Sequence, residues 1–190
     1  MASHYDSALF LHRTDKSTIL LLLYVDDMII TGNDFIGIQE LKDFLSQQFE
    51  IKDLGHLSYF LGLEITHSID ELYITQPKYA FELLSRAGLI DSKTVDNPVE
   101  LNVHLTPTEG KPLSNPSLYR RLVGSLVYLI VTCPDISYVV YQVSQYLSAP
   151  RSTHYAAILR ILRYLKGTLF HGLFYFAQSP LVLHAFSDAD

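Results

Sequence analysis

The chain has 190 residues, of which 48% are apolar, and its formal net charge is −6. This length and apolar content allow one good core or two small ones, which excludes a disordered tail. The single cysteine, Cys133, excludes an internal disulfide framework and fits a reducing compartment. We expect no secretory signal after Met1 and no membrane-spanning helix, because no apolar run approaches roughly 20 residues.

The first half of the chain is organised around residues 19–32, which read ILLLLYVDDMIITG. Two apolar runs of this kind predict strands buried on both faces, preceded by a shorter strand over residues 6–13. The adjacent carboxylates Asp26 and Asp27 fall between the two runs, at the tip of a hairpin. Asn33 or Asp34 then suits the N-cap of a helix.

The acidic tip allows two interpretations. A solvated pair of acids in a turn needs no function. However, the tip lacks the Asn-Gly or Asp-Gly pair that two-residue turns prefer, and both of its flanks are strongly apolar. Two carboxylates held close together repel each other, and a divalent cation is the usual relief. These features favour a metal site.

Further along the chain, residues 57–66 and 72–75 predict a second hairpin, and Pro77 suits the first turn of a helix that ends near Gly88. The Pro-rich residues 91–116 predict a linker, where we expect the chain to divide into domains. Helical spacing, and then strand-like runs, fill the rest: helices over 119–132, 136–147 and 154–166, and strands over 169–176 and 181–186.

Charge is distributed unevenly along the chain. Residues 111–175 hold seven Lys or Arg and one acid, a net charge of +6, so the remainder carries −12. Such a basic segment favours a nucleic-acid partner despite the acidic total. The alternative for Arg120 and Arg121 is that they pair with acids of the first half.

The sequence resembles the reverse transcriptase region of copia-type LTR retrotransposon Pol polyproteins. Tyr24-Val25-Asp26-Asp27 is similar to the YVDD box of these enzymes. Four further blocks agree with the family in order and spacing: residues 49–55 with 59–65, residues 76–79, residues 119–129 with 134–136, and residues 187–190. The resemblance spans nearly the whole chain.

An α+β fold is what the resemblance implies. Residues 1–76 would be a partial polymerase palm with the YVDD hairpin and a primer-grip hairpin, and residues 77–115 the thumb helix with its Pro-rich linker. Residues 116–168 would be a helical connection segment, and residues 169–190 the beginning of a truncated RNase H-like domain.

The resemblance also implies a two-metal nucleotidyl transfer that uses Mg²⁺, with Mn²⁺ as a substitute. Asp26 would be a direct metal ligand and Asp27 its partner, and these two would be the catalytic carboxylates. Asp188 would occupy the first metal position of the RNase H domain. In the family a third polymerase carboxylate lies on a palm strand well upstream of YVDD, and we expect that neither Asp6 nor Asp15 replaces it.

The remaining implied residues would hold nucleic acid. Phe60, Leu61 and Gly62 would form the primer grip, which holds the 3′ end of the growing strand, although Gly62 alone is also compatible with a strand bulge. Tyr24 and Val25 would set the position of the YVDD hairpin against the primer terminus. Lys52 would be a positioning residue near the leaving group, and its alternative is an ordinary surface lysine. The expected contacts with the duplex are Arg120, Arg121, Arg160 and Arg163.

From these points we expect a fragment of an RNA-directed DNA polymerase that is inactive alone, because the upstream Asp and the fingers are missing. Its partners in the complete polyprotein would be an RNA/DNA template–primer duplex and a dNTP, with no membrane. The family implies an intracellular location, cytoplasmic or nuclear. The alternatives are a residual nucleic-acid-binding module and a non-functional pseudogene product.

Overall fold

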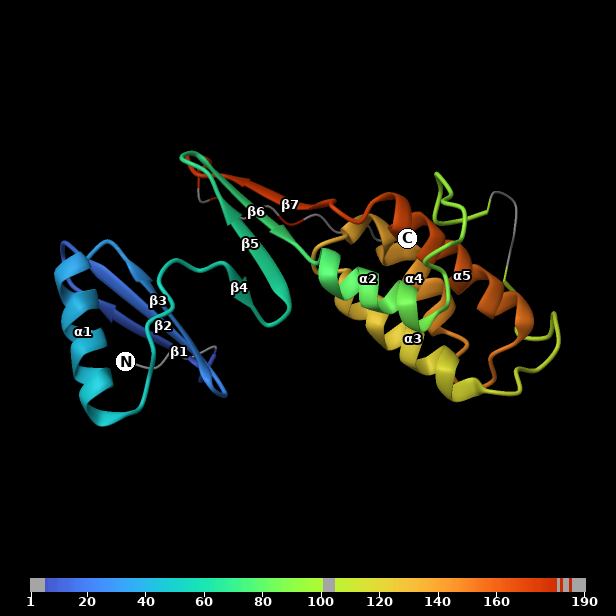
Figure 1. The fold of residues 1–190 in the computed structure, drawn as a ribbon, viewed down its shortest axis with the longest axis horizontal. Coiled ribbons are helices and arrows are strands. Elements are labelled where there is room, and N and C mark those ends of the chain that lie inside the picture. Colours follow the sequence, from blue (N-terminus) through green and yellow to red (C-terminus); the bar gives the residue numbers. More distant parts are fainter. Residues whose placement is uncertain (1–5, 101–104, 181, 183–184, 186–190) are drawn as a thin grey trace. The chain divides into compact units, whose positions relative to one another are not determined.

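The computed structural model describes residues 6–100, 105–180, 182 and 185. The chain forms two compact units, Met1–Phe60 and Leu61–Asp190 (Figure 1). The expected α+β class is confirmed: the described residues form two antiparallel sheets and five α-helices. Among these residues, no helix combines the length and the hydrophobicity that crossing a membrane requires.

The first unit contains a three-stranded antiparallel sheet and one long helix. Strand β2 lies between β1 and β3, and its register with β3 runs from Ile19 opposite Gly32 to Tyr24 opposite Asp27. Asp34 caps the helix by accepting a 2.9 Å hydrogen bond from the Gly37 N–H, as the sequence predicts. The bounds are β1 (Leu9–Arg13), β2 (Thr18–Tyr24), β3 (Asp27–Gly32) and α1 (Phe35–Gln48).

The expectation that β2 and β3 are buried on both faces is wrong for this unit. Ile19 is the one buried residue of these two strands, and their other apolar residues are half-buried or exposed. Helix α1 packs against the sheet at Ile19, where a Cβ on Gly37 would lie 2.8 Å from the Ile19 Cδ1 atom. Leu20 and Leu22 lie on the opposite face of the sheet and are half-buried.

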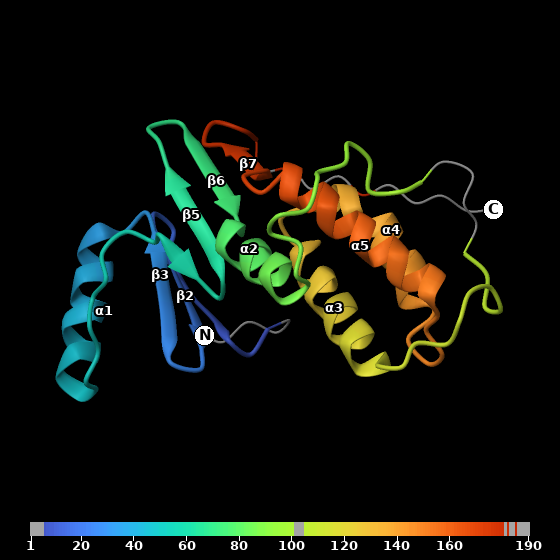
Figure 2. The ribbon, with the colours of Figure 1, turned by 45° about the vertical axis from the view of Figure 1, so that its right-hand side comes forward.

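In the second unit, a twisted hairpin leads into a helical cluster (Figures 1 and 2). Strand β6 pairs with β5 on one side and with β7 on the other, with Tyr73 opposite Phe174. The strands are β5 (Leu63–His67), β6 (Glu71–Thr75) and β7 (Gly172–Phe176), while β4 (Tyr59–Phe60) ends the first unit. The helices are α2 (Pro77–Arg86), α3 (Pro116–Leu129), the 3₁₀ turn η1 (Pro134–Ile136), α4 (Ser137–Ser144) and α5 (Ser152–Gly167).

The main core lies among α2, α3, α4 and α5. Its central side chains are fully buried. Most come from the apolar stripes of these helices, and Ile136 comes from η1. A buried polar pair joins two of the helices: the Thr132 hydroxyl donates a 2.8 Å hydrogen bond to the side-chain carbonyl of Gln76, directly before α2. Large core residues are Tyr119, Leu122, Leu126, Leu129, Ile136, Val140, Ile158 and Leu162.

Most predicted elements are present with shifted ends, but the strand predicted over residues 57–66 is divided into β4 and β5 by a turn at Leu61 and Gly62. Helix α3 begins three residues early because Asn115 accepts a hydrogen bond from the Leu118 N–H and Pro116 fills the first turn. The predicted helix 136–147 is shorter and starts with the 3₁₀ turn at Pro134. The predicted strand 181–186 and block 187–190 lie outside the described residues, except for positions 182 and 185.

The predicted linker is hydrogen-bonded to the start of α5. Lys111 and Ser152 exchange backbone and side-chain hydrogen bonds, and Pro112 forms an isolated β-bridge with Arg151. The division between the compact units lies at Phe60, not in this linker. These bonds explain why the linker belongs to the helical unit.

Candidate metal and nucleic-acid site

The YVDD hairpin ends in a two-residue turn. Tyr24 and Asp27 are the last paired residues of β2 and β3, so Val25 and Asp26 form the turn itself. Val25 has a φ of +49° and is 80% exposed, an unusual backbone conformation for a β-branched residue. Asp26 and Asp27 are both exposed. The structure therefore presents two hard oxygen donors at the tip, as the sequence predicts.

These two carboxylates fit a divalent cation in the type of their donors but not in number. Oxygen ligands are what Mg²⁺ and Mn²⁺ take in proteins, and a two-ion site needs several of them. Within the described residues, no group of three or more His, Cys, Asp or Glu is arranged to hold a metal ion. The described residues therefore supply two carboxylates at this turn but not the full ligand set of a two-ion site.

Two other acids of the first unit, Asp6 and Asp15, lie on either side of β1. Asp15 lies in the turn between β1 and β2, at the opposite end of β2 from Asp26. Asp6 lies at the same end, because Ala8 is hydrogen-bonded to Leu23 in the next strand. Its carboxylate accepts a 2.9 Å hydrogen bond from the Ala8 N–H, so it is engaged locally.

The predicted primer grip is a second two-residue turn. Strand β4 ends at Phe60 and β5 begins at Leu63, which leaves Leu61 and Gly62 between them. Their φ angles are +50° and +82°, and positive values at both central residues are typical of a type I′ turn. This geometry explains Gly62 as a turn residue, whereas a bulge would add an extra residue within a strand.

The loop around Lys52 is held by a different lysine. Lys52 is exposed in a segment with no regular structure. The Lys42 ammonium lies 2.8 Å from the carboxylate of Asp53 and, together with the Gly55 N–H, lowers the pKa of Asp53. Sequence patterns gave no signal for Lys42, because its partner is eleven residues away.

The four predicted nucleic-acid arginines lie in different surroundings. Arg120 donates to the carbonyl oxygens of Leu147 and Ser148, at 2.8 and 3.5 Å, just after α4. Those bonds are to backbone oxygens rather than to the acids that the alternative interpretation named. Arg121 is exposed, and Arg160 and Arg163 are half-buried on α5.

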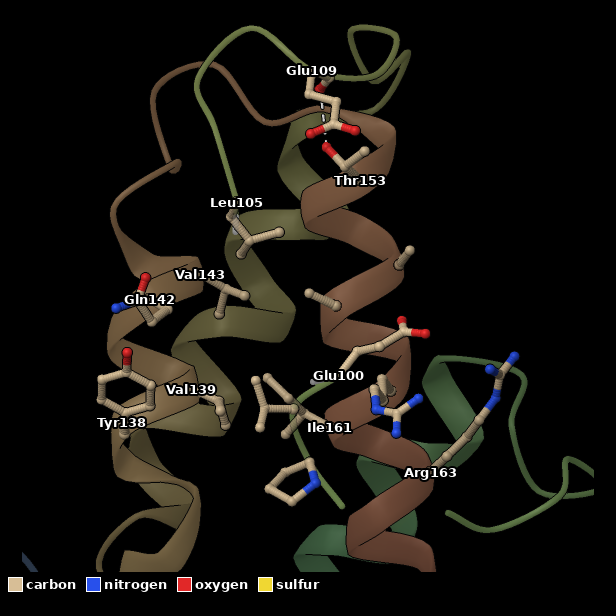
Figure 3. A pocket seen from close by; sticks show the side chains of 15 residues that line it. Glu100, Leu105, Glu109, Tyr138, Val139, Gln142, Val143, Thr153, Ile161 and Arg163 are labelled. Carbon is tan, nitrogen blue, oxygen red and sulfur yellow. Dashed lines mark hydrogen bonds between the residues drawn. The ribbon is translucent and has the colours of Figure 1, made fainter. Parts of the chain in front are cut away.

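Arg160 and Arg163 line a pocket of about 670 Å³ between α4, α5 and the linker. Figure 3 shows Val139 and Val143 of α4 on one side of this pocket and Ile161 of α5 on the other. Glu100 and Glu109 also line it, so its charge is mixed. The Nε atom of Arg160 is buried and has no hydrogen-bond partner among the described residues.

This α+β arrangement, with its acidic hairpin followed by a second hairpin and a helix, is consistent with part of a reverse transcriptase domain. The profile of the family described as reverse transcriptase (RNA-dependent DNA polymerase) matches residues 2–101, more than half of the chain. The chain belongs to this family.

Individual relatives extend the match beyond residue 101 to nearly the whole chain. Over 97% of its length the chain is 43% identical to the retrovirus-related Pol polyprotein from transposon RE2 of Arabidopsis thaliana. Over its whole length it is 36% identical to the Pol polyprotein from transposon TNT 1-94 of Nicotiana tabacum. It spans 13% and 15% of these two polyproteins.

One shorter relative covers nearly the same residues as this chain. An uncharacterized mitochondrial protein of Arabidopsis thaliana is 41% identical over 90% of this chain and 70% of its own length. No solved structure matches the chain. The expected resemblance to copia-type retrotransposon Pol polyproteins is thus confirmed, and the chain corresponds to their reverse transcriptase region.

Proposed function

We propose that this chain holds the primer–template duplex within an RNA-directed DNA polymerase and supplies part of its metal site. One observation carries the proposal. Among the described residues, the non-glycine residues with positive φ are Val25 and Leu61, and each lies in the turn of a motif with an implied role. Strained turns of this kind cluster at functional sites, because the surroundings must hold them in place.

Each turn has its own task in this proposal. Asp26 binds Mg²⁺ or Mn²⁺ directly with Asp27 as partner, and Tyr24 and Val25 hold that hairpin against the primer end. Such an ion, when bound, supplies a Lewis acid for the transfer of a nucleotide from a dNTP. Phe60, Leu61 and Gly62 hold the primer, and the arginines of α3 and α5 contact the duplex. Lys52 and Asp188 keep the roles that the resemblance implies for them.

We further propose that the 190 residues alone do not polymerise. Asp26 and Asp27 are two ligands of a site that needs more, and two adjacent acids on one hairpin tip cannot by themselves pre-organise two ions. The helical segment after the linker would be the connection to an RNase H-like domain that follows α5. The first strand after α5, β7, pairs with β6 of the second hairpin and so belongs to the sheet of this unit.

Primer extension tests this directly. The purified chain, given an RNA template, a DNA primer, dNTPs and Mg²⁺ or Mn²⁺, is expected to add no nucleotide. Synthesis that is abolished by Asp26→Asn but survives Asp15→Asn would contradict the proposed incompleteness. Asp15→Asn is the matched control because it makes the same change at the far end of β2.

A module that binds nucleic acid without chemistry is the second candidate, and the +6 charge of residues 111–175 favours it. Its affinity for a duplex must fall with salt, because phosphate contacts release counterions. Arg160→Gln/Arg163→Gln is expected to reduce the slope of log affinity against log salt by about 2, one unit for each lost contact. The control Arg13→Gln/Lys16→Gln removes the same charge from exposed positions of the first unit.

A further inference from the structure

Tyr128 of α3 contacts the turn that follows β4, 67 residues earlier in the chain. Its hydroxyl donates a hydrogen bond to the Leu61 carbonyl oxygen. The ring itself is fixed on its other side by Tyr79 of α2, with ring centroids 4.9 Å apart and planes at 76°. Tyr128 therefore connects the turn to two helices of the core.

The turn needs such outside support. Leu61 adopts a φ of +50°, which is unfavourable for a residue with a side chain, and it remains 38% exposed. A hydrogen bond to its carbonyl oxygen favours the peptide orientation that the turn requires.

The absence of a side chain at Gly62 leaves room for the same hydroxyl. A Cβ at this position would lie 2.9 Å from the Tyr128 oxygen, but 3.6 and 3.7 Å from the nearest ring carbons, which is ordinary contact. The close approach is thus to the oxygen alone. An added methyl group at Gly62 would press on the atom that holds Leu61.

We propose that Tyr128 is a positioning residue for the Phe60-Leu61-Gly62 turn, and that its hydroxyl sets where the turn meets the 3′ end of a primer. The role rests on the proposed function of the turn as a primer grip. Tyr128 itself touches no substrate in this scheme and acts through the Leu61 carbonyl.

Tyr128→Phe is the primary test, because it removes the hydroxyl and keeps the ring against Tyr79. The control is Tyr141→Phe, at an exposed residue of α4. The Gly62 amide belongs to the same peptide group as the Leu61 carbonyl. In the full chain, its NMR resonance is expected to shift in Tyr128→Phe and to stay unchanged in Tyr141→Phe. An unchanged Gly62 resonance in both variants would overturn the proposal.

Binding separates positioning from a merely structural role. Tyr128→Phe is expected to weaken binding of a duplex with a recessed 3′ end about two- to tenfold, the loss of one hydrogen bond. Binding of a blunt duplex of equal length is expected to remain as in wild type. Equal losses for both duplexes would overturn the positioning role, because a damaged fold weakens both.

A double substitution adds a second measure. Gly62→Ala is expected to weaken recessed-end binding more in the wild-type chain than in the Tyr128→Phe background, because the 2.9 Å contact is gone there. Additive effects would contradict the assigned contact. If the wild-type chain does not distinguish recessed from blunt ends, the primer-grip function itself fails, even where the Gly62 resonance shows that the contact exists.

Discussion

The imidazole of His154 stacks on the ring of Tyr146, with ring centroids 3.8 Å apart and planes inclined by 17°. His154 is fully buried at the start of α5. Its Nδ1 accepts a 3.0 Å hydrogen bond from the Arg151 N–H, and its Nε2–H donates to the Thr106 carbonyl oxygen at 2.9 Å. One buried side chain thus joins α5, the linker and the segment that follows α4.

His154→Leu is expected to lower the free energy of local unfolding of α5 by about 2–4 kcal/mol, because the Arg151 N–H and the Thr106 carbonyl lose their partners. Native-state hydrogen exchange of the α5 amides measures this quantity. His171→Leu, at an exposed histidine, is the control and should leave the exchange unchanged. Equal protection in both variants would contradict the role of His154.

Acid is expected to loosen the start of α1. Hydrogen bonds from the Gly37 N–H and then from the Ser17 hydroxyl lower the pKa of Asp34 below its ordinary value of 3.8. A lowered pKa means that this carboxylate stabilises the folded state above pH 3.8 and loses its effect as the pH falls through the folded-state pKa.

Exchange of the Gly37 and Ile38 amides against pH checks this expectation. Asp34→Asn keeps a cap but cannot titrate, so its exchange should not acquire the acid-dependent loss. Asp34→Ala should exchange faster at every pH. An acid-dependent loss of the same size in Asp34→Asn would mean that another group is responsible.

A tyrosine of α5 is expected to lose its hydroxyl proton at a higher pH than an ordinary tyrosine. The Tyr164 hydroxyl donates to Asp135, and this bond, with a smaller effect of burial, raises the pKa of Tyr164 to about 12. A raised pKa gives stability that is complete below the ordinary value of 10.0 and is lost as the pH rises to about 12. Asp135→Asn should return the pKa towards 10.0, as measured by the ¹³Cζ shift of Tyr164. An unchanged pKa in Asp135→Asn would assign the shift to burial instead.

Val25→Asn is expected to stabilise the YVDD hairpin by about 1 kcal/mol, because Asn accepts a left-handed backbone at lower cost than a β-branched residue. Little packing is lost, since Val25 is 80% exposed. Hydrogen exchange of the β2 and β3 amides measures the change. Thr31→Asn, at an exposed position within β3, is the control and should not stabilise. A loss of protection in Val25→Asn would show that the valine side chain supports the turn.

Local patterns predicted much of this fold. The apolar runs around Asp26 and Asp27 predicted the hairpin and its tip, and Pro77 predicted the start of α2. Short-range rules succeed here because strand alternation, capping and proline geometry act within a few residues. The order of the motif blocks predicted the family, which the comparisons confirm.

Other features depend on partners that are distant in the sequence. The burial of β2 was overestimated because its sequence shows which residues are apolar but not how many faces are covered. The pairing of β7 with β6 joins segments about 100 residues apart, and no local pattern carries that register. Local patterns singled out Phe60, Leu61 and Gly62 but not Tyr128, because Tyr128 and the turn it contacts are 67 residues apart in the sequence.

By itself, the sequence determined the family, the two hairpins and the positions of the implied carboxylates, because each of these depends on residues that are adjacent in the chain. Only the tertiary structure decided that Val25 and Leu61 adopt left-handed backbones, that Tyr128 reaches the Leu61 carbonyl and that His154 joins the linker to α5. These contacts form only when helices from different parts of the chain pack on a common core, which sets the distances between their polar groups.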